Sequence, residues 1–351
     1  MKKYNQYIEI AHTQDMNINT MGIRSCELIK SALLTVYKKV EISRVNNAVE
    51  LSNLISKKPD LIFLGLKRLP RSAVLDDLNQ KRRWVADQLD EEGINYTGSE
   101  HGALELGVYK HCAKTKVQEV GLPTAKFFVV KPGELLSSAN LPLEFPLFVK
   151  PDNSGGSKGI DDDSVVRNFR ELNCKIEYIF DKFGTDALVE QYLTGREFSV
   201  AILANGHGCL EVMPIEIVAD KNSRGDRLLS QGIKKADTEQ VMLVKEDSIR
   251  QQISKLAKDI FIALGARDFG RVDIRMDEAG RPYFLEANLI PGLSGGYFTR
   301  ACKMNANLSY DEMIVRIAKL GLLHPKADYP RSNLAELESP ASSVELEPSP
   351  S

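Results

Sequence analysis

The stretch Gly270–Gly292 reads GRVDIRMDEAGRPYFLEANLIPG, and its pattern predicts a β-hairpin with one polar face. Two short apolar runs flank a turn around Ala279–Gly280. Successive side chains of a strand point to opposite faces, so every second residue shares a face. The alternation places these side chains together on one face of each strand: Arg271, Asp273 and Arg275 on the first, Glu286 and Asn288 on the second.

Two carboxylates and an amide oxygen on one face are hard oxygen ligands, which suit Mg²⁺ bound to nucleotide phosphates. Gly292 follows Pro291 and lets the backbone turn sharply and approach a ligand closely. The alternative is an ordinary hairpin whose acidic side chains face solvent. The hairpin therefore favours an ATP-using enzyme. If this is correct, other segments of the chain should also suit the binding of ATP.

The composition excludes several other classes of protein. The chain has 351 residues, 43% of them hydrophobic, enough for two or three packed lobes. A net charge of -2 argues against a nucleic-acid-binding protein. Five scattered cysteines without a C-x-x-C pair indicate reduced thiols. The polar N-terminus is unlike a signal peptide, and no apolar run approaches the roughly 20 residues of a membrane span. We expect a cytoplasmic protein that binds neither nucleic acid nor membrane.

Hydrophobic periodicity predicts an N-terminal parallel sheet with helices on its faces, followed by α+β segments. The first part contains strands at 7–11, 40–45 and 61–66 and helices at 21–37, 48–56 and 84–92. The second contains helices at 104–120, 165–183, 245–264 and 310–320, strands at 126–130, 147–150, 187–191, 198–204 and 210–217, and loops at 152–159 and 219–235. We expect domains at 1–98, 99–186 and 187–324. Pro, Ser and Glu dominate 325–351, which predicts a disordered tail.

Two features resemble phosphate-binding elements. The loop Pro151–Gly159 reads PDNSGGSKG, and its flexible backbone can direct N–H groups at phosphate oxygens, although it lacks the P-loop pattern. Lys150 ends an apolar strand beside this loop, and Lys110 on the preceding helix is a second candidate cation. The alternatives are a polar surface turn and two surface lysines.

The stretch Leu188–Phe198 is a candidate for the adenosine site. An apolar strand that runs into a short connector can present backbone groups to the edge of an adenine. Glu190 can accept a hydrogen bond from the exocyclic amine, and Glu197 can accept hydrogen bonds from ribose hydroxyls. The alternative is an ordinary strand and turn with two solvated acids.

These four elements, in this order, resemble the ATP-grasp superfamily and, within it, the D-alanine–D-alanine ligase family. The resemblance covers roughly 94–322. It rests on these blocks: Tyr96–Ser99, Lys110, Gly121–Pro123, Val149–Pro151, Glu190–Phe198, Gly270–Asp273, Phe284–Gly292 and Ser309–Glu312.

The resemblance implies a three-lobed fold, with an N-terminal parallel α/β domain and ATP held between a central and a C-terminal lobe. It implies a ligase that forms an acyl phosphate from a small carboxylate substrate and then an amide with an amine substrate, and it implies a homodimer. The implied ATP contacts are Lys110, Lys150, Ser154, Gly155, Gly156, Ser157, Glu190, Tyr192, Leu193 and Glu197. Two Mg²⁺ ions, or Mn²⁺, would be bound by Asp273, Glu286 and Asn288. Arg271 and Gly292 would stabilise the oxyanion and the acceptor carbonyl.

The departures from the family fall in the substrate region. The Ser-x-Glu that grips the first substrate's ammonium is absent from Ala11–Ile18, where Asp15 is the available substitute. The acidic, Gly-rich H-G-x-x-G-E-D segment is replaced by the basic Leu64–Pro70. A serine that binds the second substrate's carboxylate aligns with Tyr297, within the segment that starts at Ser294. Arg227 is the candidate for the lysine of the substrate-covering loop.

Lys67, Arg68 and Arg71 therefore suggest an acyl substrate that is more acidic than D-alanine, the alternative being a solvated basic turn. The sequence favours an ATP-dependent carboxylate–amine ligase with an altered amino-acid pocket. A genuine D-alanine–D-alanine ligase and a non-catalytic nucleotide-binding regulator are the other two hypotheses.

Overall fold

The computed structural model describes residues 3–15, 20–69, 84–206 and 208–323. Its N-terminal part is a three-stranded parallel sheet in the order β2-β1-β3, flanked by helices. Its elements are β1 (Tyr4–His12), α1 (Ile23–Leu34), β2 (Tyr37–Arg44), α2 (Ala48–Ser56), β3 (Leu61–Leu64) and α3 (Val85–Glu91). The predicted alternation of strands and helices is confirmed, and α2 begins where the Asn47 side chain accepts a hydrogen bond from Glu50 N.

A four-stranded antiparallel sheet in the order β4-β7-β5-β6 forms the middle of the chain, and α6 packs against it. Two short helices precede this sheet. The elements are α4 (His101–Leu106), α5 (Lys110–Glu119), β4 (Phe127–Val130), η1 (Ser138–Asn140), β5 (Leu147–Pro151), η2 (Asp162–Ser164), β6 (Val165–Val166), α6 (Phe169–Phe183) and β7 (Ala187–Gln191).

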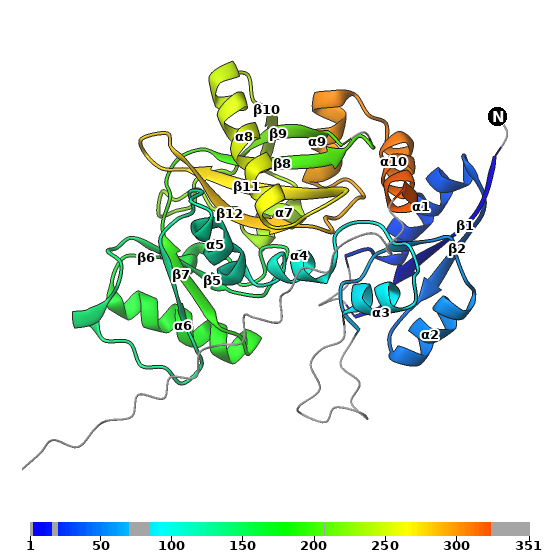
Figure 1. The fold of residues 1–351 in the computed structure, drawn as a ribbon. Coiled ribbons are helices and arrows are strands. Elements are labelled where there is room, and N and C mark those ends of the chain that lie inside the picture. The colour runs from blue at the N-terminus through cyan, green and yellow to red at the C-terminus, as the bar shows by residue number, and fades with distance from the viewer. Residues whose placement is uncertain (1–2, 16–19, 70–83, 207, 324–351) are drawn as a thin grey trace, which may run out of the picture.

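A five-stranded antiparallel sheet in the order β10-β9-β8-β11-β12 forms the C-terminal part. Its elements are β8 (Glu197–Ala204), β9 (Leu210–Val218), α7 (Gln231–Ala236), β10 (Gln240–Leu243), α8 (Asp247–Ala263), β11 (Phe269–Met276), β12 (Pro282–Asn288), α9 (Tyr297–Ala306) and α10 (Tyr310–Leu323). The N-terminal sheet lies beside this lobe and the α6 lobe lies below it (Figure 1). The predicted three-lobed architecture is confirmed.

Several predicted elements are wrong in detail, each for a local reason. The helix expected at 104–120 is two helices, because α4 ends at Gly107 and Tyr109 takes an extended conformation before α5. The helix expected at 165–183 starts only at Phe169, where the Asn168 side chain caps it, so that Val165–Val166 pairs with β5 instead. The loop expected at 219–235 ends in α7, which Ser230 caps. Helix α9 and strand β10 were not predicted.

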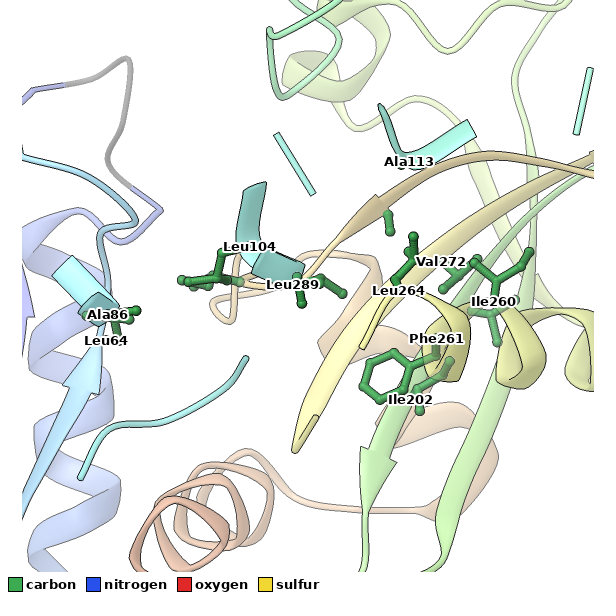
Figure 2. Packing of buried hydrophobic residues seen from close by; sticks show 14 of the residues in the cluster. Leu64, Ala86, Leu104, Ala113, Ile202, Ile260, Phe261, Leu264, Val272 and Leu289 are labelled. Carbon is green, nitrogen blue, oxygen red and sulfur yellow. The ribbon is translucent and has the colours of Figure 1, made fainter. Parts of the chain in front are cut away.

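One hydrophobic core runs continuously from the N-terminal domain into the five-stranded sheet. Leu104 of α4 belongs to the same cluster as Leu64 and Ala86 of the N-terminal domain and as Leu289 and Val272 of the C-terminal hairpin. Figure 2 shows Leu104 beside Leu289, between these two groups. The position of the N-terminal domain relative to the C-terminal lobe is therefore set by packed side chains.

No helix among the described residues is long and apolar enough to cross a membrane. The predicted tail at 325–351 and Arg71 lie outside the described residues. The domain limits expected at residues 98, 186 and 324 stay predictions.

Candidate active site

The hairpin β11–β12 aligns its polar residues in register. Arg271 lies opposite Asn288 and Asp273 lies opposite Glu286. A register shift follows this pair, because Ile274 lies opposite Phe284, which leaves Leu285 as an extra residue. A bulge lets two successive residues face the same side, and Leu285 and Glu286 do line one pocket. The expected polar face of the hairpin is confirmed.

Charge on this face is balanced by close pairs. The Arg271 guanidinium donates two hydrogen bonds to the Asp273 carboxylate, at 2.9 and 2.8 Å, and Ser199 Oγ donates a third at 2.7 Å. Burial alone would raise the pKa of Glu286, but Lys110, Lys150, Lys234 and Arg271 outweigh it and lower the pKa to about 2. Glu286 is therefore an anion at neutral pH.

Lys110 connects the Gly/Ser loop to the hairpin. Its Nζ donates to the carbonyl oxygens of Asp152 (3.1 Å) and Ser154 (2.6 Å) and lies 3.8 Å from Glu286 Oε2. Burial lowers the pKa of Lys110, although Glu286 opposes this effect. The first residue of α5 thus holds the start of the loop against β12.

A buried group of three charges lies behind the loop. Lys150 Nζ is 2.7 Å from Glu190 Oε1, and Lys114 Nζ is 2.9 Å from Glu190 Oε2. Lys114 is fully buried and also donates to Thr124 Oγ1 at 2.9 Å. Burial would raise the pKa of Glu190, but the two lysines outweigh it and lower the pKa. Glu190, expected at the adenine, is also the counter-ion of two lysines, of which Lys114 was not predicted as a site residue.

A first pocket, here called the aromatic pocket, lies between the two antiparallel sheets. The rings of Phe148 and Tyr192 stack in it with centroids 6.3 Å apart. Glu197 lines it and pairs with Arg275 at 3.1 Å, while burial raises the pKa of Glu197. The candidate residues that line this pocket are Lys150, Ser157, Glu190, Tyr192, Leu193, Glu197, Asp273 and Glu286.

A second and larger opening is here called the basic cleft. It is bordered by the N-terminal domain, α5, the Gly/Ser loop and the hairpin. The candidate residues that line it are Lys110, Ser154, Gly155, Gly156, Arg271, Glu286, Asn288 and Gly292. Lys67 and Arg68 also line it, and Arg68 is only 7% exposed, which argues against the alternative of a solvated turn for Arg68. Glu286 lines both openings, which therefore meet at the hairpin.

The loop between the two openings has the open backbone that a phosphate-binding role needs. Gly156 and Gly159 have positive φ, and so does Ser157. A Cβ added at Gly155 or Gly156 would contact nothing within 4 Å. There is therefore free space directly above the loop backbone.

The candidate substrate residues are less closely associated with the two openings. Asp15 and Arg227 line neither of them, and the exposed Arg227 donates to Ala219 O at 2.8 Å. Ser294 Oγ lies 2.6 Å from Ser25 Oγ of α1. The Tyr297 hydroxyl donates to Glu239 Oε1 at 2.5 Å, and its ring lies 5.8 Å from the Arg271 guanidinium.

Lys234, rather than Arg227, extends from the 219–235 segment into the aromatic pocket. It lies on α7, with Nζ 5.6 Å from the centre of the Tyr297 ring. Lys234 was not predicted as a site residue, because the polar sequence of this segment favours a loop. The Ser230 N-cap is the signal that could have located the helix.

Among the described residues, no three His, Cys, Asp or Glu side chains are grouped to hold a metal ion by themselves. The hairpin instead offers two carboxylates and one amide. Such a set fits Mg²⁺ when phosphate oxygens complete its coordination.

Comparison with known proteins identifies the family. Residues 117–319, more than half of the chain, match the family model described as the C-terminus of D-ala D-ala ligase. The chain belongs to the D-alanine–D-alanine ligase family. It is 32% identical over 234 residues to the uncharacterized protein y4sG of Sinorhizobium fredii, covering 66% of this chain and 67% of that protein. It is 28% identical over 256 residues to a D-alanine–D-alanine ligase of Hydrogenovibrio crunogenus, covering 68% of this chain and 75% of that ligase.

Solved structures show the same fold. A D-alanine–D-alanine ligase of Bacillus anthracis, complexed with ATP, superposes with a TM-score of 0.68 at 19% identity, over 90% of this chain and 97% of that one. The D-alanine–D-alanine ligase of Coxiella burnetii superposes with a TM-score of 0.63 at 15% identity, over 91% of this chain and 94% of that one. The D-alanine–D-alanine ligase fold therefore includes the N-terminal domain, although the family model begins at residue 117.

Proposed function

We propose that this chain is an ATP-dependent carboxylate–amine ligase that works through an acyl phosphate and has an altered substrate pocket. One observation carries the proposal: the aromatic pocket and the basic cleft meet at Glu286, beside the paired Arg271 and Asp273. A nucleotide in the pocket would direct its phosphates toward an acid in the cleft.

The adenosine would occupy the aromatic pocket, against Tyr192 and Leu193, with Glu197 at the ribose. The triphosphate would lie under the loop Ser154–Ser157, near Lys110 and Lys150. The solved Bacillus anthracis ligase of the same fold is a complex with ATP, which supports ATP as the nucleotide.

The oxygen donors Asp273, Glu286 and Asn288 would hold two Mg²⁺ ions, or Mn²⁺ in their place. Their fit rests on the cross-strand register and on the anionic state of Glu286. When bound, the metal would neutralise phosphate charge during transfer.

The proposed reaction has two steps. An oxygen of the substrate carboxylate attacks the γ-phosphorus, and the bond to the β-phosphate oxygen breaks, which releases ADP and leaves an acyl phosphate. The amine nitrogen then attacks the acyl carbon, the bond to the phosphate oxygen breaks, and the amine loses a proton to solvent. Arg271 and the backbone N–H of Gly292 would stabilise the oxyanion between these two bond changes.

The identity of the substrates is tested by incubating the purified chain with ATP, Mg²⁺ and pairs of acids and amines. We expect ADP and phosphate only with a specific pair, identified by the mass of the product. Brisk phosphate release with D-alanine alone would favour the second candidate, a genuine D-alanine–D-alanine ligase, which the named relatives support. ATP binding without turnover for any pair would favour a nucleotide-binding regulator.

Glu286→Gln tests the hairpin directly. We expect kcat to fall by about a hundredfold or more, because the anion that faces Lys110 and the phosphates is lost. Glu278→Gln, in the exposed turn of the same hairpin, is the matched control and should keep its kcat. Unfolding curves should show that both variants remain folded. Unchanged turnover in Glu286→Gln would refute the proposed role.

We further propose domains at 1–98, 99–186 and 187–324, a homodimeric state and a cytoplasmic location. Light scattering of the purified chain measures the mass of the assembly and would contradict the dimer if the particle weighs about 39.1 kDa.

A further inference from the structure

The basic cleft has an unusual balance of charge. Five of its lining side chains are cations: Lys67, Arg68, Lys110, Lys158 and Arg271. Among the described residues that line it, Glu286 alone is an acid. An ammonium group would therefore meet repulsion at this site, while an anion would be attracted from several directions.

Three of these cations have partners or positions that tie them to the ATP reaction. Lys110 holds the loop carbonyls and approaches Glu286, and Arg271 is paired with Asp273. Lys158 belongs to the Gly/Ser loop. Lys67 and Arg68 are different, because they come from the N-terminal domain and approach the cleft from the opposite side.

The topology explains why two cations are presented there. They lie three and four residues after the end of β3, at the carboxyl end of a parallel strand, which is where open α/β sheets bind ligands. Gly65 permits a close approach to β1: a Cβ there would lie 2.7 Å from Ala11 O of that strand. The backbone at Gly65 therefore lies close to β1, and Lys67 and Arg68 follow two and three residues later, where they line the cleft.

Arg68 is held rigidly in this position. It is only 7% exposed, and its guanidinium lies 5.5 Å from the centre of the Trp84 ring. Its Nη1 donates to the Tyr109 hydroxyl at 3.4 Å, and its backbone bridges to Trp84. A guanidinium fixed against an aromatic ring is pre-organised to bind a carboxylate or phosphate through two parallel hydrogen bonds.

Lys67 makes no ion pair with any residue of the described ranges. Burial, Arg68 and Lys110 lower its pKa to about 8, although the Glu286 carboxylate opposes this effect. A desolvated cation surrounded by like charges is costly unless an anion joins it. An anionic group between Lys67 and Arg68 would remove that cost.

We propose that the acyl substrate is a dianionic acid, with one carboxylate at Arg271 and Lys110 for activation and a second acidic group bound between Lys67 and Arg68. This inference rests on the proposed ligase function and specifies its substrate. The second group is a carboxylate or a phosphate, since both suit a fixed guanidinium beside a lysine.

The test traps the acyl phosphate with hydroxylamine, so that the natural amine need not be known. The full chain, ATP and Mg²⁺ are incubated with acids that differ only in the second group: glutarate against glutaramate, succinate against succinamate, and phosphoglycerate against glycerate. We expect hydroxamate formation with kcat/KM about tenfold or more higher for the dianion of at least one pair. If, in every pair, the acid with the anionic second group reacts no better than the acid with the neutral second group, the inference is overturned. D-alanine as the best substrate would also overturn it, while leaving the ligase proposal intact.

Substitutions test whether Lys67 and Arg68 bind the second acidic group of the substrate. Lys67→Gln and Arg68→Gln should each raise KM for the dianion by about tenfold or more, with KM for ATP unchanged. Arg68→Lys should recover part of the loss, because it restores the charge without the planar fork. Lys116→Gln is the control, because the Lys116 side chain on α5 is half-exposed and pairs with Glu119. It should change neither the KM for the dianion nor the KM for ATP. Unchanged KM in both Gln variants would overturn the assignment.

Calorimetric titration separates this inference from the proposed function. Dianions are titrated into the chain in the presence of ADP and Mg²⁺, with and without Lys67→Gln. Tight binding of a dianion that is lost in the variant, without any hydroxamate, would support the anion site and count against the ligase. Absence of binding for every acid would overturn the anion site itself.

Discussion

At the residue scale, Glu190 determines the electrostatics behind the phosphate loop. Its two carboxylate oxygens hold Lys150 and Lys114, both almost fully buried. A buried pair stabilises little compared with an apolar equivalent, but removing one partner leaves an uncompensated charge. The arrangement thus keeps Lys150 in place at the edge of the aromatic pocket.

We predict that Lys114→Ala lowers the free energy of unfolding by about 3 kcal/mol, because Glu190 then keeps only one counter-ion in a buried site. Lys116→Ala, which removes a half-exposed pair with Glu119 on the same helix, should cost less than about 1 kcal/mol. Urea unfolding of the two variants measures the difference. Equal losses would contradict the structural role of the buried pair.

His111 supplies a pH-dependent contact to the start of the same loop. Its hydrogen bond to Asp152, with Nδ1 2.7 Å from Oδ2, raises the pKa of the ring to about 10. The pKa of an unfolded histidine is about 6.5. Because the folded pKa is higher, this contact stabilises fully below about pH 6.5, and the stabilisation is lost as the pH rises toward 10.

We predict that His111→Gln lowers the free energy of unfolding by about 1 kcal/mol at pH 6, allowing for solvent around a ring that is 34% exposed. The difference from the original chain should shrink steadily between pH 7 and pH 10. Urea unfolding at several pH values measures it. A difference that is constant with pH would show that the imidazolium does not contribute.

At the scale of elements, the connector between β7 and β8 is held against the hairpin through Gly195. Its N–H donates to Met276 O at 3.0 Å, and a Cβ there would lie 2.5 Å from Asp277 O and 2.7 Å from Met276 O. Those atoms belong to the backbone and cannot rotate away. The close approach places Tyr192, Leu193 and Glu197 along the aromatic pocket.

We predict that Gly195→Ala costs about 1–3 kcal/mol and raises KM for ATP, because the connector must move away from the hairpin. Gly232→Ala in α7 is the control: its Cβ would meet only Ser230 Oγ at 3.7 Å, and alanine favours a helix. Thermal unfolding and ATP kinetics measure both effects. Normal ATP kinetics in Gly195→Ala would contradict the positioning role of the connector.

The elements that sequence patterns predicted well are those with a regular period and clear ends. The amphipathic helix α8 and the strands β7, β8, β11 and β12 have these properties. The helices that were predicted wrongly or not at all have local causes. Asn168 and Ser230 cap helices where a continuous apolar run or a polar loop had been expected. Helix α9 follows the Gly-rich Ser294–Gly296, which on sequence grounds favours a loop.

At the scale of the whole molecule, α10 joins the C-terminal lobe to the N-terminal sheet (Figure 1). Gly321 lies at this contact, where a Cβ would be 2.7 Å from Leu61 Cδ1 and 3.1 Å from Tyr96 O. Close packing at this contact helps to set the position of Lys67 and Arg68, which follow β3, relative to the hairpin.

We predict that Gly321→Val lowers the free energy of unfolding by about 1–3 kcal/mol and reduces kcat, because the N-terminal domain is displaced from the basic cleft. Lys319→Val, exposed on the same helix, should cost less than about 1 kcal/mol and leave kcat unchanged. Stability and turnover of both variants are compared. Full activity in Gly321→Val would show that the cleft does not depend on this contact.

The sequence by itself determined the hairpin, its polar face, the order of the candidate nucleotide elements and the family, because short strands and their motifs depend on neighbouring residues. The tertiary structure decided which charges meet. Lys114, Lys150 and Glu190 lie on separate elements, and Lys67 and Arg68 are distant in sequence from the hairpin that they face. Such contacts depend on how the lobes pack, which no local pattern records. For this reason the basic turn could be interpreted as solvated surface until the fold placed Lys67 and Arg68 in the cleft.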